Sequence, residues 1–207
     1  MLRQDGFDGP IDVALKEGTA GFVLDGGRIP AGSDRVRMTL KAPSKAPGKP
    51  VALQLEGHAQ IQGRNVSHQA VPADDVMQAF LYRHLVPAQQ LLVSVQKARW
   101  GMPRVTLAAD GPVRIPAGGS ARVLVKIPKR SILKEMQLKL KDPPAGVTLG
   151  EVAVVSEGLA FRIGANVESG RSRPVGNLIV EVFREYYPKQ KDGKPSSKKR
   201  RYSLGVF

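Results

Sequence analysis

Apolar and polar side chains alternate along most of this chain, in short runs separated by glycine and proline. A period of two residues with many β-branched side chains predicts half-buried strands. The runs predicted as strands are 10–17, 20–24, 34–41, 51–56, 104–108, 121–128, 135–140, 152–156, 159–166, 177–185 and 200–207. We expect the last of them, 200–207, to form a hairpin with 177–185. A second hairpin is expected over 57–71, turning near Gly63 and Asn65.

The five-residue phrase RIPAG occurs twice, at 28–32 and at 114–118. A proline, an alternating run and a glycine precede each copy, and an alternating run that ends at proline follows it. The period is far longer than the 20–50 residues of stacked repeats, so the repetition predicts two copies of one domain. The proline fits a strand end, and the glycine two residues later permits the positive φ of a tight turn.

The run after each phrase carries three apolar residues at alternate positions. They are Val36, Met38 and Leu40 in the first copy, and Val123, Val125 and Ile127 in the second. Both runs are therefore predicted to be strands that bury one face.

One segment indicates a helix. Pro72, Asp74 and Asp75 would supply a favourable helix start, with the acids at the positive end of the dipole. Val76 and Phe80 are spaced as i and i+4. We expect one or two helical turns here, joining the two domains.

The predicted fold class is all-β, with two tandem antiparallel β-sandwich domains of immunoglobulin or fibronectin type. The first would span 1–83 and the second 84–207, with a basic hairpin loop at 188–201. The segment 85–95 should open the second domain, and the first domain has no counterpart of this strand. We therefore expect a segment of a longer polypeptide, whose first domain lacks its N-terminal strand and exposes an open edge for self-association.

The amino-acid composition excludes several kinds of site and structure. The chain has no cysteine, which excludes disulfides and cysteine-ligated zinc. It has no run of 18 apolar residues, so we expect no membrane span. Aromatic residues make up only 5% of the chain, so the cores should consist mainly of aliphatic side chains.

Positive charge concentrates in the second half. The formal net charge is +14, and 188–201 alone contains seven basic residues and one acidic residue. One interpretation is a solvated loop around the Asp192-Gly193 turn, in which lysines discourage edge pairing. The other is a polyanion-binding site, whose affinity would fall steeply with salt. Its candidate residues are Lys189, Lys191, Lys194, Lys198, Lys199, Arg200 and Arg201.

Three aromatic residues are candidates for a carbohydrate platform. Trp100 follows the first predicted strand of the second domain, and Tyr186 and Tyr187 lie at the base of the basic loop. Exposed aromatic rings stack on sugars and bases. For Trp100, packing at the domain junction is the alternative.

We identify no catalytic constellation in the sequence. With a turn at Gly63, His58 and His68 would lie directly opposite one another and could share a metal, but a third ligand at suitable spacing is missing. His84 is expected to be a hydrogen-bonded hinge residue. We therefore expect a protein that is not an enzyme and that needs no metal or other cofactor.

Four phrases carry a family resemblance: "RQDGFDGPIDVAL", "GGRIPAG", "PADDVMQAFLYRHLVPAQQLLVSV" and "PVGNLIVEVF". Together they resemble the tandem immunoglobulin-like modules of large secreted proteins from planctomycete- and verrucomicrobia-type bacteria, where such modules neighbour pre-peptidase C-terminal-type domains. The resemblance implies an extracytoplasmic, non-catalytic accessory region at the cell surface or in the medium. Its expected partners are neighbouring domains of the same polypeptide and polyanions or glycans of the envelope.

Overall fold

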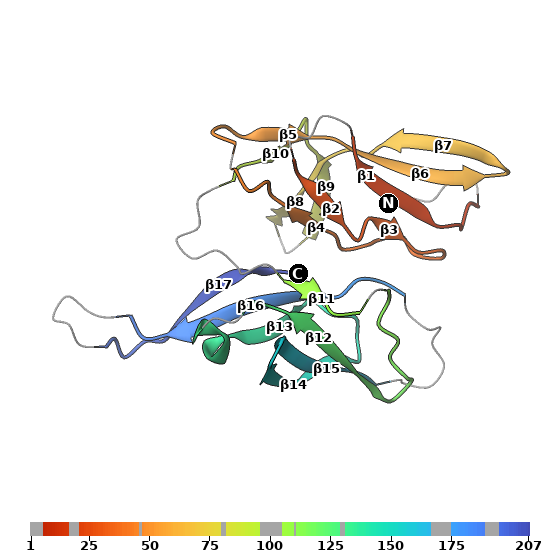
Figure 1. Cartoon of the computed structure of the whole chain (residues 1–207). Coiled ribbons are helices and arrows are strands. Elements are labelled where there is room, and N and C mark those ends of the chain that lie inside the picture. The colour runs from red at the N-terminus through yellow and green to blue at the C-terminus, as the bar shows by residue number, and fades with distance from the viewer. Residues whose placement is uncertain are drawn as a thin grey trace. The chain divides into compact units, whose positions relative to one another are not determined.

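The computed structural model describes residues 6–16, 21–45, 47–79, 82–95, 105–109, 111–128, 131–166, 175–188 and 195–207. Over these residues the chain is all-β, with antiparallel strands in several sheets and no α-helix (Figure 1). It divides into two compact units. The first unit comprises Met1–Lys97 with Val175–Asn177, and the second comprises Ala98–Pro174 with Leu178–Phe207.

The second unit contains two antiparallel sheets, with strand orders β11-β12-β15-β14 and β13-β16-β17. A single 3-10 segment, η2 (Ser131–Glu135), precedes β13. The strands are β11 (Thr106–Leu107), β12 (Ser120–Lys126), β13 (Gln137–Lys141), β14 (Val147–Val155), β15 (Gly158–Ala165), β16 (Ile179–Tyr186) and β17 (Arg200–Val206).

One core joins the two sheets of the second unit. Alternate residues of β12 and β15 from one sheet, and of β13, β16 and β17 from the other, form a single buried apolar cluster. Val125, Leu159 and Val182 at its centre have 0% exposure. Burying a side chain of this kind completely stabilises a fold by about 1.5–3 kcal/mol. The period-two alternation in the sequence therefore becomes one continuous core.

The first unit is divided into smaller sheets, with orders β3-β1-β6-β7, β10-β5, β2-β4 and β8-β9. Among its described residues, the buried apolar side chains are Phe22, Ile29 and Leu53. Its strands are β1 (Ile11–Leu15), β2 (Val23–Asp25), β3 (Arg28–Ile29), β4 (Thr39–Lys41), β5 (Val51–Leu53), β6 (Leu55–Ile61), β7 (Arg64–Gln69), β8 (Ala73–Gln78), β9 (Tyr82–Pro87) and β10 (Leu91–Val93).

The repeated phrase forms the same turn in both units. In each copy the proline carbonyl accepts a hydrogen bond from the amide three residues later, at 3.2 Å in the first unit and 3.0 Å in the second. Gly32 and Gly118 have φ of +70° and +68°. A positive φ at the third of four residues is the requirement of a type II turn, which explains the glycine. The predicted turn and its glycine are confirmed in both units, and Pro30 directly follows β3 in the first. The strand expected over 34–41 is shorter, because only Thr39–Lys41 pairs with β2 and residues 34–38 lie outside any strand.

Several predicted strands are confirmed, including the hairpin of β16 with β17 and that of β6 with β7. The helix expected after Pro72 is wrong, because Ala73–Gln78 is strand β8 and pairs with β9. A six-residue helix with no packing partner would be unstable in water, whereas the hairpin pairs both backbones. The segment expected to open the second domain contributes to the first unit instead, because β10 pairs with β5. The described residues include no helix long and apolar enough to cross a membrane.

Candidate polyanion-binding hairpin

The basic segment lies at the end of the β16–β17 hairpin. Val180 and Val182 of β16 and Leu204 of β17 point into the core of the second unit, and Tyr202 packs against it. Their neighbours in the sequence must point to the opposite, outer face of the sheet, since side chains alternate along a strand. The hairpin is therefore anchored by apolar residues on one face and carries charges on the other.

A β-bulge sets the position of the charged residues. Val182 pairs with Gly205 and Phe183 pairs with Ser203, so Leu204 is an extra residue on β17. Gly205 has φ of +147°, a conformation that favours glycine. Beyond the bulge, Glu185 lies opposite Arg201 and Tyr186 lies opposite Arg200. Adjacent arginines consequently face opposite sides of the sheet.

Arg201 belongs to an ionic cluster around Glu181, which is itself 6% exposed, while the cations around it reach solvent. Its Nη2 lies 2.7 Å from Oε2 of Glu181, and Nζ of Lys141 lies 3.4 Å from the same oxygen. The Arg201 guanidinium also stacks on the Phe183 ring, 3.6 Å from its centroid. Burial raises the pKa of Glu181, but the Ser203 hydroxyl and the two cations outweigh it and hold the pKa below its ordinary value of 4.5.

Lys199 is also paired. Its Nζ lies 2.5 Å from Oε2 of Glu185. The hydrogen bond between them lowers the pKa of Glu185 and raises the pKa of Lys199. Lys199 and Arg201 are therefore largely neutralised by carboxylates of β16.

Lys198 and Arg200 differ from these two residues. Both are exposed, and neither forms an ion pair with another residue in the described part of the chain. Tyr186, opposite Arg200, is half-buried, while Tyr187 is 55% exposed. Of the candidates from the sequence, the structure places Arg200 opposite Tyr186, while Tyr187 interacts electrostatically with Lys199. Lys189, Lys191, Lys194 and Trp100 lie outside the described residues.

The expected pairing of His58 with His68 is wrong. His58 lies opposite Ser67, and His68 lies opposite Gly57, so the two imidazoles are on opposite faces of the β6–β7 hairpin. The turn occupies Gln62 and Gly63, and this register differs by one residue from the one we expected. His84 is an exposed residue of β9, not a hinge. No group of three or more metal-ligating side chains occurs within the described residues.

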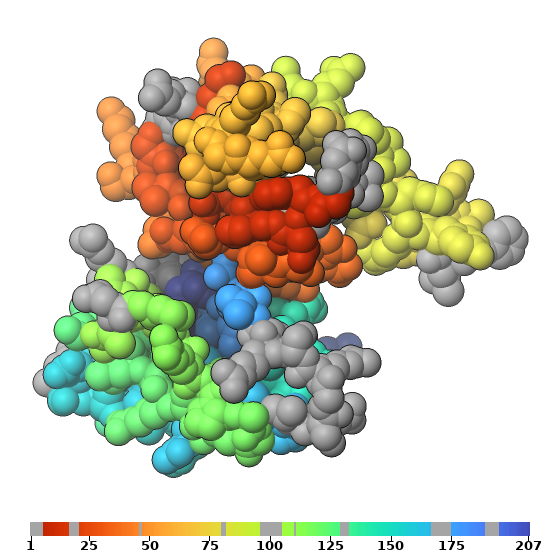
Figure 2. Space-filling model, turned by 90° about the vertical axis from the view of Figure 1, so that its right-hand side faces the viewer, coloured from red at the N-terminus to blue at the C-terminus, as the bar shows by residue number. Residues whose placement is uncertain are grey.

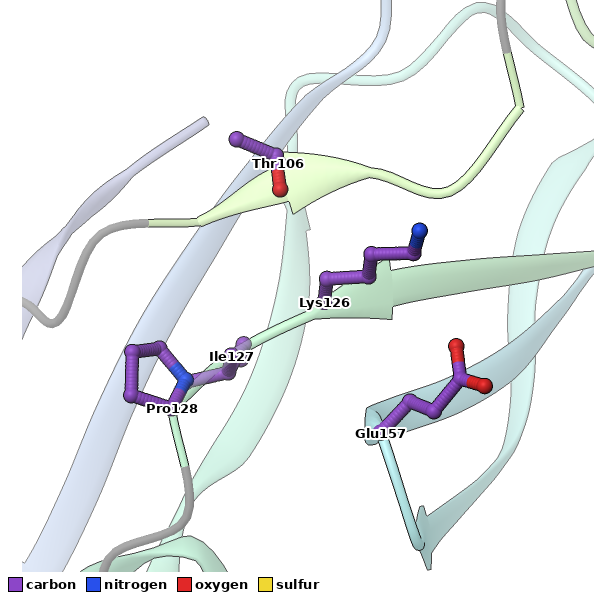
Figure 3. Close-up of a pocket in the computed structure, with 5 residues that line it drawn as sticks. All are labelled: Thr106, Lys126, Ile127, Pro128 and Glu157. Carbon is purple, nitrogen blue, oxygen red and sulfur yellow. The ribbon is translucent and has the colours of Figure 1, made fainter.

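The second unit also has a shallow depression beside β11 and the end of β12 (Figure 3). Lys126 and Glu157 end on one side of it, and Ile127 and Pro128 lie on the other. Thr106 completes the lining. These five residues supply one cation, one carboxylate and one hydroxyl, but within the described part of the chain no hydrogen bond joins the Thr106 hydroxyl to the Glu157 carboxylate.

The sequence analysis did not identify the carboxylates that pair with two of the four described basic candidates, Lys199 and Arg201. Glu181 and Glu185 occupy alternate positions of β16 with Phe183 between them, so they share one face. Their shared face could be predicted from the sequence alone. Which cation lies next to each carboxylate depends on the bulged register of β17. Comparisons of this chain with protein-family models, with curated proteins and with solved structures gave no match.

Proposed function

We propose that this chain is a non-catalytic accessory region of a larger exported bacterial protein, built from two tandem immunoglobulin-like β-sandwiches. The observation that carries the proposal is the strand order of the second unit. Its sheets β11-β12-β15-β14 and β13-β16-β17 correspond, in chain order, to A-B-E-D and C-F-G. This is the order of a constant-type immunoglobulin sandwich.

The first unit is, in this proposal, a second and less regular sandwich. The repeated type II turn supports a common origin of the two units. The alternating burial of β1, with Ile11, Val13 and Leu15 half-buried and the residues between them exposed, supports a sheet with one face turned to a core.

The proposed accessory role is supported by the arrangement of the polar groups on the surfaces of the two units. Within the described residues, no hydrogen bond joins Thr106 of the depression to the Glu157 carboxylate, and the two histidines of the β6–β7 hairpin lie on opposite faces. Sandwiches without catalytic groups serve as spacers or adhesive modules, because they hold neighbouring domains apart and present long strand surfaces. The family resemblance supports an extracytoplasmic location.

Fractionation of the cells that make the protein tests this proposal. An antibody raised against this segment should detect a band far larger than the 22.3 kDa chain in the envelope or in the medium. A band of the chain's own mass confined to the cytoplasm would refute an exported parent protein.

A second candidate function is polyanion binding by the end of the β16–β17 hairpin. The observation that favours it is the pair of exposed cations, Lys198 and Arg200, neither of which forms an ion pair within the described residues. Each lysine or arginine that contacts a polyanion releases counterions, so each contributes to the salt dependence of binding.

Titration with a short DNA duplex at several salt concentrations tests this function. Replacing Lys198 and Arg200 with glutamine should reduce the slope of log K against log salt by about 2, since each phosphate contact contributes about 0.9. Lys45→Gln with Lys49→Gln is the matched control, because both lysines are exposed and lie outside the hairpin. Equal losses in the two double variants would show that total charge alone drives the binding.

A further inference from the structure

No third strand from the described part of the chain pairs with the β8–β9 hairpin. It forms a two-stranded sheet of its own, and all twelve residues of β8 and β9 are exposed. Figure 2 shows this yellow segment standing out from the rest of the first unit. An isolated two-stranded hairpin is only marginally stable in water. Additional strands or a covering surface would stabilise it.

Its exposed side chains are unusually apolar. Leu85 is 75% exposed, Tyr82 70%, Met77 56%, Val86 47% and Val76 44%. Val76, Tyr82 and Val86 share one face of the hairpin, because Val76 lies opposite His84, Tyr82 opposite Gln78, and Val86 opposite Asp74. Contiguous exposed apolar surface of this kind marks an interaction site.

The alternation of hydrogen-bonded and non-hydrogen-bonded pairs in the hairpin shows which backbone amides point away from the partner strand. The amide of Ala88 donates to the carbonyl of Pro72 at 2.8 Å, so these two residues form a hydrogen-bonded pair. Bonded and non-bonded pairs alternate in an antiparallel ladder. The amides of Ala73, Asp75 and Met77 therefore face the free edge of β8.

The free edge of β9 is less suited to pairing. By the same alternation it carries Arg83, Leu85 and Pro87, and proline has no amide to donate. Proline and charged side chains on an edge discourage the addition of another strand. The structure therefore favours β8 as the edge that accepts a partner.

Charge favours a second copy of this chain as the occupant. The chain as a whole carries +14, so two copies repel each other over most of their surface. The hairpin is an exception, since 73–87 contains two aspartates and one arginine. Asp75 also pairs with Arg83 at 2.7 Å. Two chains can therefore approach here with little repulsion.

We propose that β8 pairs antiparallel with β8 of a second copy about a two-fold axis at Val76. In this register Asp75 lies opposite Met77 of the partner subunit, and no like charges face each other. The outward amides of Asp75 and Met77 would each bond across the edge. A shift of the axis to Asp75 would place two aspartates opposite one another, which is unfavourable. The result is a four-stranded sheet on which the Val76 faces of both hairpins merge.

Sedimentation equilibrium of the full chain tests the proposal. We expect a mass twice that of the 22.3 kDa chain at high protein concentration, with association strengthened by salt because screening weakens the repulsion between copies. A mass of one chain at every concentration would overturn the proposal. A dimer in which the outer edge of β8 stays unpaired would also overturn the proposal.

A matched pair of proline variants identifies the edge. Met77→Pro removes an outward amide from β8, and Leu85→Pro removes one from β9; neither residue belongs to a hydrogen-bonded pair within the hairpin. Met77→Pro should give a monomer, and Leu85→Pro should remain a dimer. Equal behaviour of the two variants, with both still folded by circular dichroism, would contradict pairing through β8.

A single introduced cysteine gives an independent readout in this cysteine-free chain. At the two-fold axis Val76 forms a non-hydrogen-bonded pair with its own copy, at a Cα separation of about 4.5 Å, which a disulfide can bridge. Val76→Cys should therefore crosslink under mild oxidation. Leu85→Cys is more exposed but should crosslink much less, and the opposite order would overturn the proposed register.

Discussion

The same phrase and the same type II turn are followed by different structures in the two units. In the second unit β12 begins at Ser120, two residues after the turn glycine, whereas in the first unit residues 34–38 lie outside any strand and β4 begins only at Thr39. In the second unit, Val123, Val125 and Ile127 are 5%, 0% and 3% exposed. In the first unit, Val36 and Met38 are half-buried, and Leu40 is 37% exposed. Both runs have the same alternation in the sequence. The difference in burial must therefore come from the strands that surround each run, and not from the order of apolar and polar residues.

The neighbours of each strand explain this difference. β12 lies between β11 and β15, and its inner face is covered by the sheet of β13, β16 and β17. Among the strands that the structure describes, β4 pairs only with β2, and it is three residues long. An alternating run therefore specifies which side chains share a face, while the surrounding sheets decide how completely that face is buried.

The largest expected effect comes from two aligned apolar positions, one exposed and one buried. Leu40 and Ile127 occupy corresponding places in the two copies, and their side chains have the same number of carbon atoms. Ile127→Ala should reduce the free energy of unfolding of the second unit by about 2–5 kcal/mol. Leu40→Ala should cost the first unit less than about 1 kcal/mol. Denaturant unfolding followed by hydrogen exchange assigns each loss to its unit, and equal losses would contradict the difference in burial.

The two units also differ in how deeply they bury a carboxylate that pairs with cations. Glu181 of the second unit is buried between Arg201 and Lys141, whereas Glu56 of the first unit has a more exposed side chain, 3.2 Å from Lys16. Glu181→Gln should cost about 2 kcal/mol, because hydrogen bonds to a buried charge are lost. Glu56→Gln should cost less than about 1 kcal/mol. A larger loss for Glu56 in denaturant titrations would show that burial does not control the value of these ion pairs.

Acid should weaken the second unit through the same carboxylate. The pKa of Glu181 is lower in the folded chain than its ordinary value of 4.5. Its contribution is therefore fully present above that value and is lost as the pH falls through the folded pKa. Measured against pH, the unfolding free energy of the second unit should fall less steeply below pH 4.5 in Glu181→Gln than in the unmodified chain. If the two curves of unfolding free energy against pH were parallel, Glu181 would not contribute to the loss of stability in acid.

The smallest expected difference concerns the turn glycines. Gly32 and Gly118 have nearly the same positive φ, +70° and +68°, although their units differ in burial. Replacing either with alanine should cost about 1 kcal/mol, because alanine is strained in this conformation. The two losses should agree within the error of a thermal denaturation experiment. A clear inequality would show that the turns are equivalent only in backbone geometry.

Local features were predictable from the sequence, whereas long-range pairing was not. The alternation of apolar and polar residues predicted several of the strands, such as β16 and β17, and the glycine two residues after proline predicted the turn. The segment after Pro72 was misread because acidic residues near a proline also suit a helix start, and only pairing with Tyr82–Pro87 made it a strand. Histidine placement failed because a shift of one residue in a hairpin moves a side chain to the other face.

The candidate site was predictable only as a concentration of charge. The sequence identified the basic segment, but ion pairing depends on which residues lie across the hairpin. Arg200 and Arg201 are adjacent in the sequence, yet Arg201 joins Glu181 while Arg200 has no ionic partner within the described residues. The bulge at Leu204 determines this alignment, and a bulge has no clear sequence signature beyond the nearby glycine.

Hydrogen exchange of the intact chain tests most directly whether the two units differ in core despite their shared turn. Amides of β12, β15 and β16 should exchange slowest, because opening them exposes the buried cluster of the second unit. Amides of β4 should exchange much faster. Equal protection of β4 and β12, lost together in a single cooperative step, would contradict the account.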